Sequence, residues 1–125
     1  MEYRRKIQSF TDLEAWKEGH KLVLEIYEIT KKFPNEEKFG LVSQLRRATI
    51  SITSNIAEGF RRETYKEKVR FYSMSLSSLS EVQNQLLIAR DVNYIKNKEF
   101  QMPAIQSVVT SKLIGGLVRS SKKKS

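Results

Sequence analysis

The 125-residue sequence contains no cysteine, only two prolines and only five glycines. Without cysteine the chain has no disulfide, no thiolate nucleophile and no cysteine-ligated metal site, and it suits the reducing cytoplasm. Such a shortage of turn-forming residues argues against an all-β fold. Apolar runs are short and interrupted by charges, so we expect no membrane-spanning helix, and the basic start of the chain lacks the apolar stretch of a secretory signal.

Residues that commonly perform catalysis are also scarce. His20 is the only histidine, and its position predicts a structural, core-facing side chain rather than a ligand or base. No Glu-x-x-His pair is present, which excludes a di-iron bundle site. Gly115 and Gly116 lack the lysine and the strand-to-helix context of a phosphate-binding loop. We therefore predict no catalytic residue, no metal ion and no cofactor.

The first of four predicted helices spans residues 12–32, with Thr11 or Asp12 as its cap and Pro34 beyond its end. Two neighbouring apolar stripes cover more than half of its circumference, which is wider than one core face requires. One stripe consists of Leu13, Trp16, Val23 and Tyr27, and the other of Ala15, Leu22, Ile26, Ile29 and Phe33.

The second helix is predicted over residues 36–58 and the third over residues 64–91, where Thr64 and Glu67 have the spacing of a capping box. The core stripe of the second helix is Leu41, Leu45, Ala48, Ile52 and Ile56. That of the third helix is Tyr65, Val69, Tyr72, Leu76, Leu79 and Leu86.

The fourth helix is predicted over residues 98–118, limited by Pro103 near its start and weakened by two glycines near its end. Its apolar positions are Ile105, Val108, Val109 and Leu113. We expect residues 120–125 to form a mobile basic tail. Four helices with three short connections predict one all-α domain over residues 1–125, an antiparallel up-down-up-down four-helix bundle.

Several apolar residues fall outside the core stripes. Exposed apolar patches usually mark interfaces, so these positions predict self-association. The residues assigned to this interface are Leu22, Ile29, Ile50, Ala57, Met74 and Ile88.

Basic residues are concentrated in three segments, 1–12, 59–68 and 117–125, which an up-down bundle brings to one end. Together these segments hold eleven basic and four acidic residues, a net +7 out of the total of +9. Such an end is either merely solvated or binds a polyanion such as RNA through phosphate contacts. The candidate nucleic-acid-binding residues are Arg4, Arg5, Lys6, Arg61, Arg62, Lys66, Arg119, Lys122, Lys123 and Lys124, and nearby aromatics that could stack on bases are Tyr3, Phe10, Phe60 and Tyr65.

The most distinctive sequence motif lies between Gln44 and Phe60 and contains Asn55-Ile-Ala-Glu-Gly59. Asn55 falls at the edge of the core stripe, so we expect it to be hydrogen-bonded and to fix the register against the third helix. Glu81 is expected to pair with an arginine of the second helix, Arg46 or Arg47, within the subunit or across its interface. The structural motif residues are Arg47, Asn55, Glu58, Gly59 and Glu81.

This motif, together with other short matches, resembles the intervening-sequence or S23-like family, whose members look like open reading frames within insertions in bacterial 23S rRNA genes. The other matches are Phe10–Trp16, Lys32–Pro34, Phe39–Leu41, Ser78–Glu81, Gln85–Arg90 and Tyr94-Ile95, so residues 10–95 are covered, with weaker similarity at Lys112–Leu117. The chain departs from the family pattern at Ser51–Thr53, where a proline is usual, and at Gln83-Asn84, where acidic residues are usual.

The resemblance implies a four-helix bundle that forms a homo-oligomer, typically a ring-shaped pentamer, and it supplies no catalytic residues. A related branch, the accessory proteins of diversity-generating retroelements, binds nucleic acid and a reverse transcriptase. Two functions therefore stay open at this point: a homo-oligomer that binds structured RNA or DNA without strong base specificity, and a protein-interaction scaffold that binds no nucleic acid itself.

Overall fold

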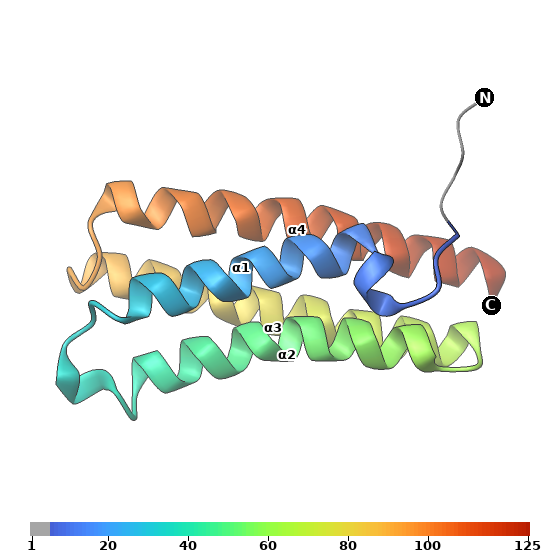
Figure 1. Cartoon of the computed structure of the whole chain (residues 1–125), viewed down its shortest axis with the longest axis horizontal. Coiled ribbons are helices and arrows are strands. Elements are labelled where there is room, and N and C mark those ends of the chain that lie inside the picture. The colour runs from blue at the N-terminus through green and yellow to red at the C-terminus, as the bar shows by residue number, and fades with distance from the viewer. Residues whose placement is uncertain (1–5) are drawn as a thin grey trace.

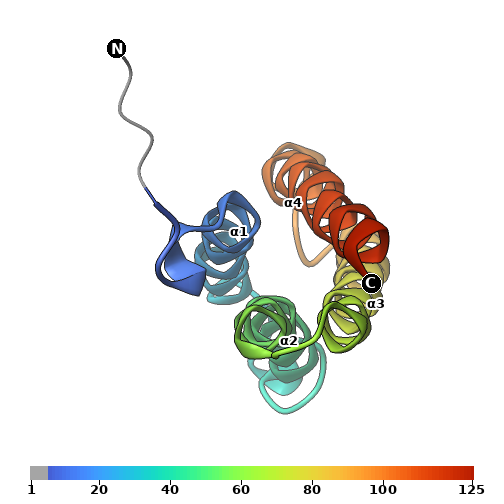
Figure 2. The ribbon, with the colours of Figure 1, turned by 90° about the vertical axis from the view of Figure 1, so that its right-hand side faces the viewer.

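The computed structural model describes residues 6–125, which form four long helices and two short 3-10 helices. The elements in chain order are η1 (Phe10–Asp12), α1 (Glu14–Thr30), η2 (Asn35–Glu37), α2 (Leu41–Arg61), α3 (Tyr65–Asp91) and α4 (Asn97–Lys124). Consecutive helices are antiparallel and adjacent, and α4 also packs against α1 (Figures 1 and 2). The predicted all-α, up-down four-helix arrangement is confirmed.

The core lies between the four helices and consists mainly of aliphatic side chains. The large side chains that are almost wholly removed from solvent include Leu22, Ile26, Leu45, Ile52, Ile56, Leu79, Val82, Leu86 and Ile114. Removing each of these from water contributes about 1.5–3 kcal/mol, so these positions hold the helices together. The predicted core positions Leu45, Ala48, Ile52 and Ile56 of α2 and Tyr72, Leu79 and Leu86 of α3 are all buried.

The inward face of α1 includes Leu22, one of the residues that were assigned to the oligomer interface. Leu22 has no exposed surface, so its assignment to the oligomer interface is wrong. Gly19 explains the choice of face, because a Cβ there would lie 3.1 Å from the Thr53 methyl of α2 and 3.7 Å from the Thr110 methyl of α4. The face with the smallest residue turns inward because it allows both neighbouring helices to approach closely.

The core-facing position predicted for His20 is also wrong. Its side chain is exposed and stacks on Trp16, with ring centroids 4.7 Å apart. Tyr65, which was expected in the core of α3, is 40% exposed because it occupies the first turn at the open end of the bundle.

Helix α2 begins five residues later than predicted, since η2 and Gly40 precede it. Glu37 caps its start: one carboxylate oxygen accepts the Leu41 N–H at 3.0 Å and the other accepts the Tyr94 hydroxyl at 2.7 Å. Glu37 therefore connects the α1–α2 link, the first turn of α2 and the segment between α3 and α4.

Helix α4 buries a different face from the one its apolar pattern predicts. Ile105 is 65% exposed, and Val108 and Val109 are exposed as well. The buried positions are Pro103, Ser107, Thr110, Ile114, Val118 and Ser121. The Thr110 hydroxyl donates to the Gln106 carbonyl at 2.8 Å, so this small side chain is buried without an unpaired donor. The helix continues to Lys124, and the segment expected to be a mobile tail is helical.

Candidate nucleic-acid interface

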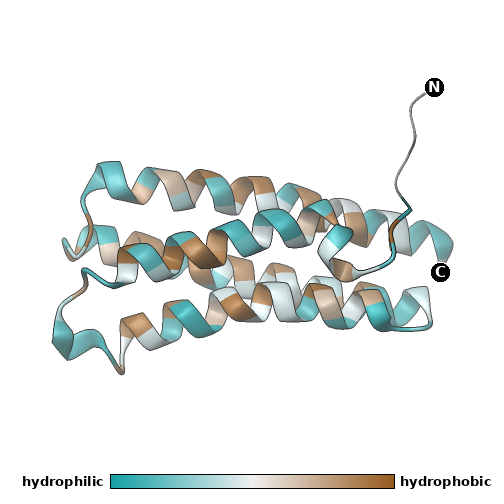
Figure 3. Ribbon diagram, in the orientation of Figure 1, coloured by the Kyte–Doolittle hydropathy of each residue, from teal (hydrophilic) through white to brown (hydrophobic). Residues whose placement is uncertain are grey.

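Residues 6–12, the α2–α3 turn and the end of α4 lie at the same end of the bundle, as the up-down topology predicts (Figure 1). The end of α4 there is coloured hydrophilic (Figure 3). We define the basic end as the described cationic residues of these segments, which are Lys6, Arg61, Arg62, Lys66, Lys68, Arg119, Lys122, Lys123 and Lys124. Asp12, Glu63 and Glu67 are the described acidic residues of the same segments, which leaves a net +6. Arg4, Arg5 and Tyr3 lie outside the described residues.

Lys68 belongs to the structure of this end rather than to its free surface. Its ammonium group donates to the Gly59 carbonyl at 3.1 Å and to the Phe60 carbonyl at 2.6 Å. Both carbonyls belong to the last turn of α2, where a cation interacts favourably with the helix dipole. Burial lowers the pKa of Lys68. Lys68 therefore acts as a cap that ties the start of α3 to the end of α2.

Arg62 is also engaged within the subunit. It donates to the Glu58 carboxylate at 3.0 Å, and its guanidinium carbon lies 4.4 Å from the centre of the Phe71 ring. The glutamate of the Asn55–Gly59 motif thus holds an arginine against α3. Because Arg62 is half-buried and paired, it has little freedom to contact a ligand.

The remaining cations of the basic end are exposed and free of salt bridges to the described acidic residues. They are Lys6, Arg61, Lys66, Arg119, Lys122, Lys123 and Lys124. Two of them lie over aromatic rings: Lys124 is 5.4 Å from the centre of Tyr65, and Arg61 is 5.9 Å from that of Phe10. One contact joins α4 to the exposed Tyr65 of α3, and the other joins α2 to the half-buried Phe10 of η1, so positive charge and aromatic rings lie together at this end.

Asn55 is hydrogen-bonded, although not to α3 as expected. Its amide nitrogen donates to the Ser51 carbonyl at 2.9 Å and to the Ser51 hydroxyl at 3.1 Å. Ser51 in turn shares a 2.9 Å hydrogen bond with Ser78 of α3. A second contact between the helices is made by the buried Ser75, which donates to the Ile52 carbonyl at 2.8 Å. Asn55 therefore makes no direct contact with α3 among these bonds; Ser75 and the Ser51–Ser78 pair cross between the helices, and Asn55 orients Ser51.

The expected ion pair between Glu81 and an arginine of α2 is wrong within the subunit. Glu81 and Arg47 are both exposed, and within residues 6–125 neither forms a salt bridge. Arg46 instead donates to the Thr30 hydroxyl at 3.0 Å and lies 4.4 Å from the centre of the Tyr27 ring. Pairing across a subunit interface stays a prediction.

Three of the residues assigned to an interface, Ile50, Met74 and Ile88, are exposed. Ile29 and Ala57 are half-buried. The sequence reasoning missed Phe39, which is 89% exposed in the link before α2. Residue 39 fell inside the predicted second helix but outside its core stripe, and its exposure follows from the later start of α2 at Leu41.

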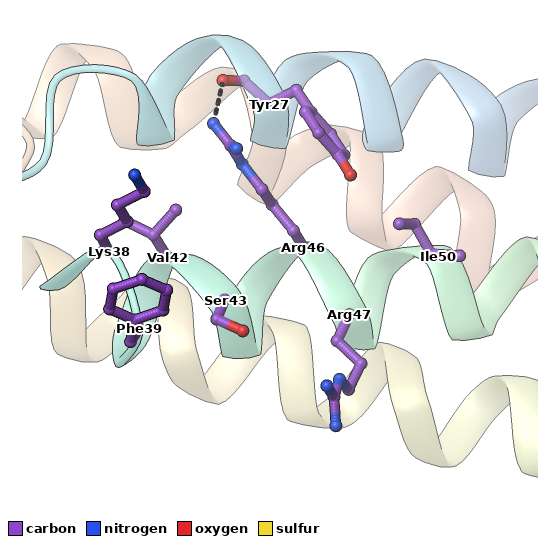
Figure 4. Close-up of a pocket in the computed structure, with 8 residues that line it drawn as sticks. All are labelled: Tyr27, Lys38, Phe39, Val42, Ser43, Arg46, Arg47 and Ile50. Carbon is purple, nitrogen blue, oxygen red and sulfur yellow. Dashed lines mark hydrogen bonds between the residues drawn. The ribbon is translucent and has the colours of Figure 1, made fainter.

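Phe39 borders a groove of about 450 Å³ on the outer surface of α2 (Figure 4). We call it the α2 groove. It is lined by Tyr27, Lys38, Phe39, Val42, Ser43, Arg46, Arg47 and Ile50. Four of the lining residues have the i, i+3, i+4, i+7 spacing of a hole that accepts a side chain from another helix. They are Ser43, Arg46, Arg47 and Ile50. The lining contains three cations and no carboxylate.

Within the described part of the chain, no cluster of three or more histidine, aspartate or glutamate side chains is arranged to hold a metal ion. Among the same residues, none of the helices combines the length and apolar character needed to cross a bilayer.

Comparison with known proteins identifies the family. The family model described as "23S rRNA-intervening sequence protein" matches residues 11–116. The fold is similar to the crystal structure of a protein from Bacteroides thetaiotaomicron described as of unknown function and from the S23 ribosomal protein family, with a TM-score of 0.77 and 20% identity over 84% of this chain and 95% of that one. A search of curated proteins gives no match. Because the family model covers most of the chain, the chain belongs to the 23S rRNA-intervening sequence protein family.

Proposed function

We propose that the protein is a non-enzymatic homo-oligomer that binds nucleic acid, and structured RNA in particular, through its basic end. The observation that supports this most strongly is the meeting of residues 6–12, the α2–α3 turn and the end of α4 at one end of the bundle, where seven described cations are exposed. Arginine and lysine side chains that neutralise phosphates release counterions, and this supplies affinity without base specificity.

The exposed ring of Tyr65 and the half-buried ring of Phe10 add a second kind of contact. Unpaired bases of RNA loops stack on aromatic side chains, and cations beside the ring contact the adjoining phosphates. Lys124 beside Tyr65 and Arg61 beside Phe10 have this combination. The basic end is therefore suited to RNA elements that expose unpaired bases next to a helical backbone.

Self-association increases the effect of each weak contact. Several copies of the basic end in one assembly bind a long polyanion with far greater avidity than a single copy, provided that they can engage together. A ring-shaped pentamer is the assembly that the family resemblance favours. Exposed apolar residues such as Phe39, Ile50 and Ile88 support self-association.

The proposal is tested with two variants that remove equal charge. One replaces Lys66, Lys122, Lys123 and Lys124 of the basic end with glutamine, and the other replaces Lys21, Lys31, Lys98 and Lys112 on the rest of the surface. All eight lysines are exposed. We expect the first variant to bind a fluorescent stem-loop RNA at least tenfold more weakly than the second in anisotropy titrations, with helicity and oligomer mass unchanged. Equal losses would indicate diffuse attraction to net charge, and no binding by the wild type at low salt would refute the proposal.

A second candidate function is a scaffold that binds another protein, such as a reverse transcriptase in a retroelement. The observation that favours it is the uncovered apolar face of α4, where Met102 and Ile105 are both exposed by about two-thirds of their surface. In that case substitution of these two residues with serine would abolish capture of the partner while leaving RNA binding unchanged.

A further inference from the structure

The outer face of α3 is nearly free of charge. Residues 71–89 contain a single charged residue, Glu81, and it is exposed without an ion pair in the described part of the chain. Met74, Glu81 and Ile88 are seven residues apart, so they form one straight stripe along the solvent side of α3. We call this the α3 stripe. Two exposed apolar side chains, Met74 and Ile88, thus flank one carboxylate on this face, with the uncharged Ser77 and Asn84 between them.

The α2 groove has the complementary composition. Residues 41–57 contain two charged residues, Arg46 and Arg47, and no acidic one. Arg47 is exposed and unpaired at one side of the groove, while Phe39 and Ile50 provide apolar surface near its ends. The groove therefore suits a helix that presents an apolar side chain and a carboxylate, which is the composition of the α3 stripe.

The two surfaces also have matching heights along the bundle. Gln85 donates to Gln44 at 3.4 Å and Ser78 is 2.9 Å from Ser51, which fixes the antiparallel register of α2 and α3. Because the helices are antiparallel, moving one residue forward along α2 reaches the height of the residue one position earlier in α3. Arg47 thus lies level with residues 81 and 82, and Ile88 lies level with Leu41, between Phe39 and Ser43.

We propose that the α2 groove of one copy receives the α3 stripe of a second copy of this chain. A rotation about an axis parallel to the bundle preserves height, so it brings Glu81 of one copy to Arg47 of the next and Ile88 to the apolar surface beside Phe39. This inference rests on the self-association in the proposed function and specifies its interface.

The central ion pair is tested by charge reversal in the full-length protein. We expect Arg47→Glu and Glu81→Arg each to reduce the mass measured by light scattering at tens of micromolar toward the 14.6 kDa of one chain. The double variant should restore the larger mass. Mixing the two single variants in equal amounts should also restore larger species, because each contact between unlike copies again joins opposite charges; a pair within one subunit could not be rescued in this way.

The apolar part has its own matched pair of variants. Phe39→Ser should weaken self-association at least tenfold, whereas Met102→Ser, which removes an exposed apolar side chain from α4, should not. Circular dichroism confirms that both remain folded.

The outcomes separate this inference from the function on which it rests. An oligomeric wild type whose mass is insensitive to Arg47→Glu, Glu81→Arg and Phe39→Ser overturns the interface and leaves self-association standing. A wild type of 14.6 kDa overturns the interface and self-association together. RNA binding, measured on the same samples, decides separately whether the basic end functions as proposed.

Discussion

Gly59 of α2 and Tyr72 of α3 approach so closely that no side chain fits between them. A Cβ on Gly59 would lie 2.6 Å from Cε1 of Tyr72 and 3.2 Å from Cβ of Phe71. The glycine of the Asn55–Gly59 motif is thus a packing residue inside a helix, since α2 continues to Arg61. It allows α3 to begin directly against the end of α2, and so places the basic end.

We predict that Gly59→Ala destabilises the fold by about 1–3 kcal/mol, because the added methyl group overpacks a buried ring. Gly116→Ala is the matched control: its nearest neighbour would be the flexible end of Arg119 at 3.9 Å. That variant should stabilise α4 by up to about 1 kcal/mol, the usual difference between alanine and glycine in a helix. Urea unfolding monitored by circular dichroism measures both, and equal effects of the two substitutions would contradict the packing role.

Glu37 predicts a dependence of stability on pH. The backbone hydrogen bond from Leu41, and then the Tyr94 hydroxyl, lower the pKa of its carboxyl group below the ordinary 4.5. Because the folded pKa is lower than the unfolded one, the carboxylate contributes stability above the unfolded pKa, and this contribution disappears as pH falls through the folded pKa. The wild type should therefore be more stable than Glu37→Gln near neutral pH, and the difference should shrink in acid.

The control for this prediction is Glu36→Gln, which removes the same charge one residue away without the two hydrogen bonds. Its free energy of unfolding, measured against the wild type across the same pH range, should show a smaller difference at neutral pH. If Glu37→Gln and Glu36→Gln behave alike at every pH, the capping role of Glu37 is excluded.

Lys66 and Lys68 lie two residues apart in α3 and should have separate roles. Lys68→Met removes both hydrogen bonds to the last carbonyls of α2, so we expect a loss of about 1–2 kcal/mol in stability. Lys66→Met should leave stability within about 0.5 kcal/mol, as is usual for an exposed residue, and should weaken RNA binding. Chemical denaturation and RNA titration of both variants test this, and a stability loss on Lys66→Met equal to that on Lys68→Met would contradict it.

The periodic aliphatic residues of α2 were sufficient to predict most of its apolar core. In α3 the predicted stripe included the buried Tyr72, Leu79 and Leu86 but omitted Val82 and Ala89. Leu45, Ile52 and Ile56 recur on one face and have no competing stripe of similar strength. Helix α4 was not predictable in this way, because Ser107, Thr110 and Ser121 face inward while its exposed face carries isoleucine and valine. A hydroxyl that bonds to its own helix can be buried at little cost, and a hydropathy pattern cannot detect that compensation.

The location of the basic end followed from topology alone, since an up-down bundle must bring its first, middle and last segments together. The topology did not show which of these cations remain free to contact a ligand. Lys68 is held by carbonyls of α2, and Arg62 by Glu58 and the Phe71 ring. These contacts depend on the approach of α2 and α3 at Gly59, which only the packed structure shows.

The salt dependence of RNA binding distinguishes a phosphate-contacting surface from diffuse attraction. For single-stranded or duplex targets, the logarithm of affinity falls with the logarithm of salt concentration by about 0.7–0.9 per phosphate neutralised. If Lys66, Lys122, Lys123 and Lys124 each contact a phosphate, replacing all four with glutamine should make the slope shallower by roughly 3 for each bound subunit. The variant of Lys21, Lys31, Lys98 and Lys112 has lost the same net charge, but these lysines lie outside the basic end. Its slope should therefore stay near that of the wild type. Anisotropy titrations between about 50 and 200 mM salt cover the range in which such slopes are measured. Parallel lines for the wild type and the basic-end variant would mean that these lysines contact no phosphate.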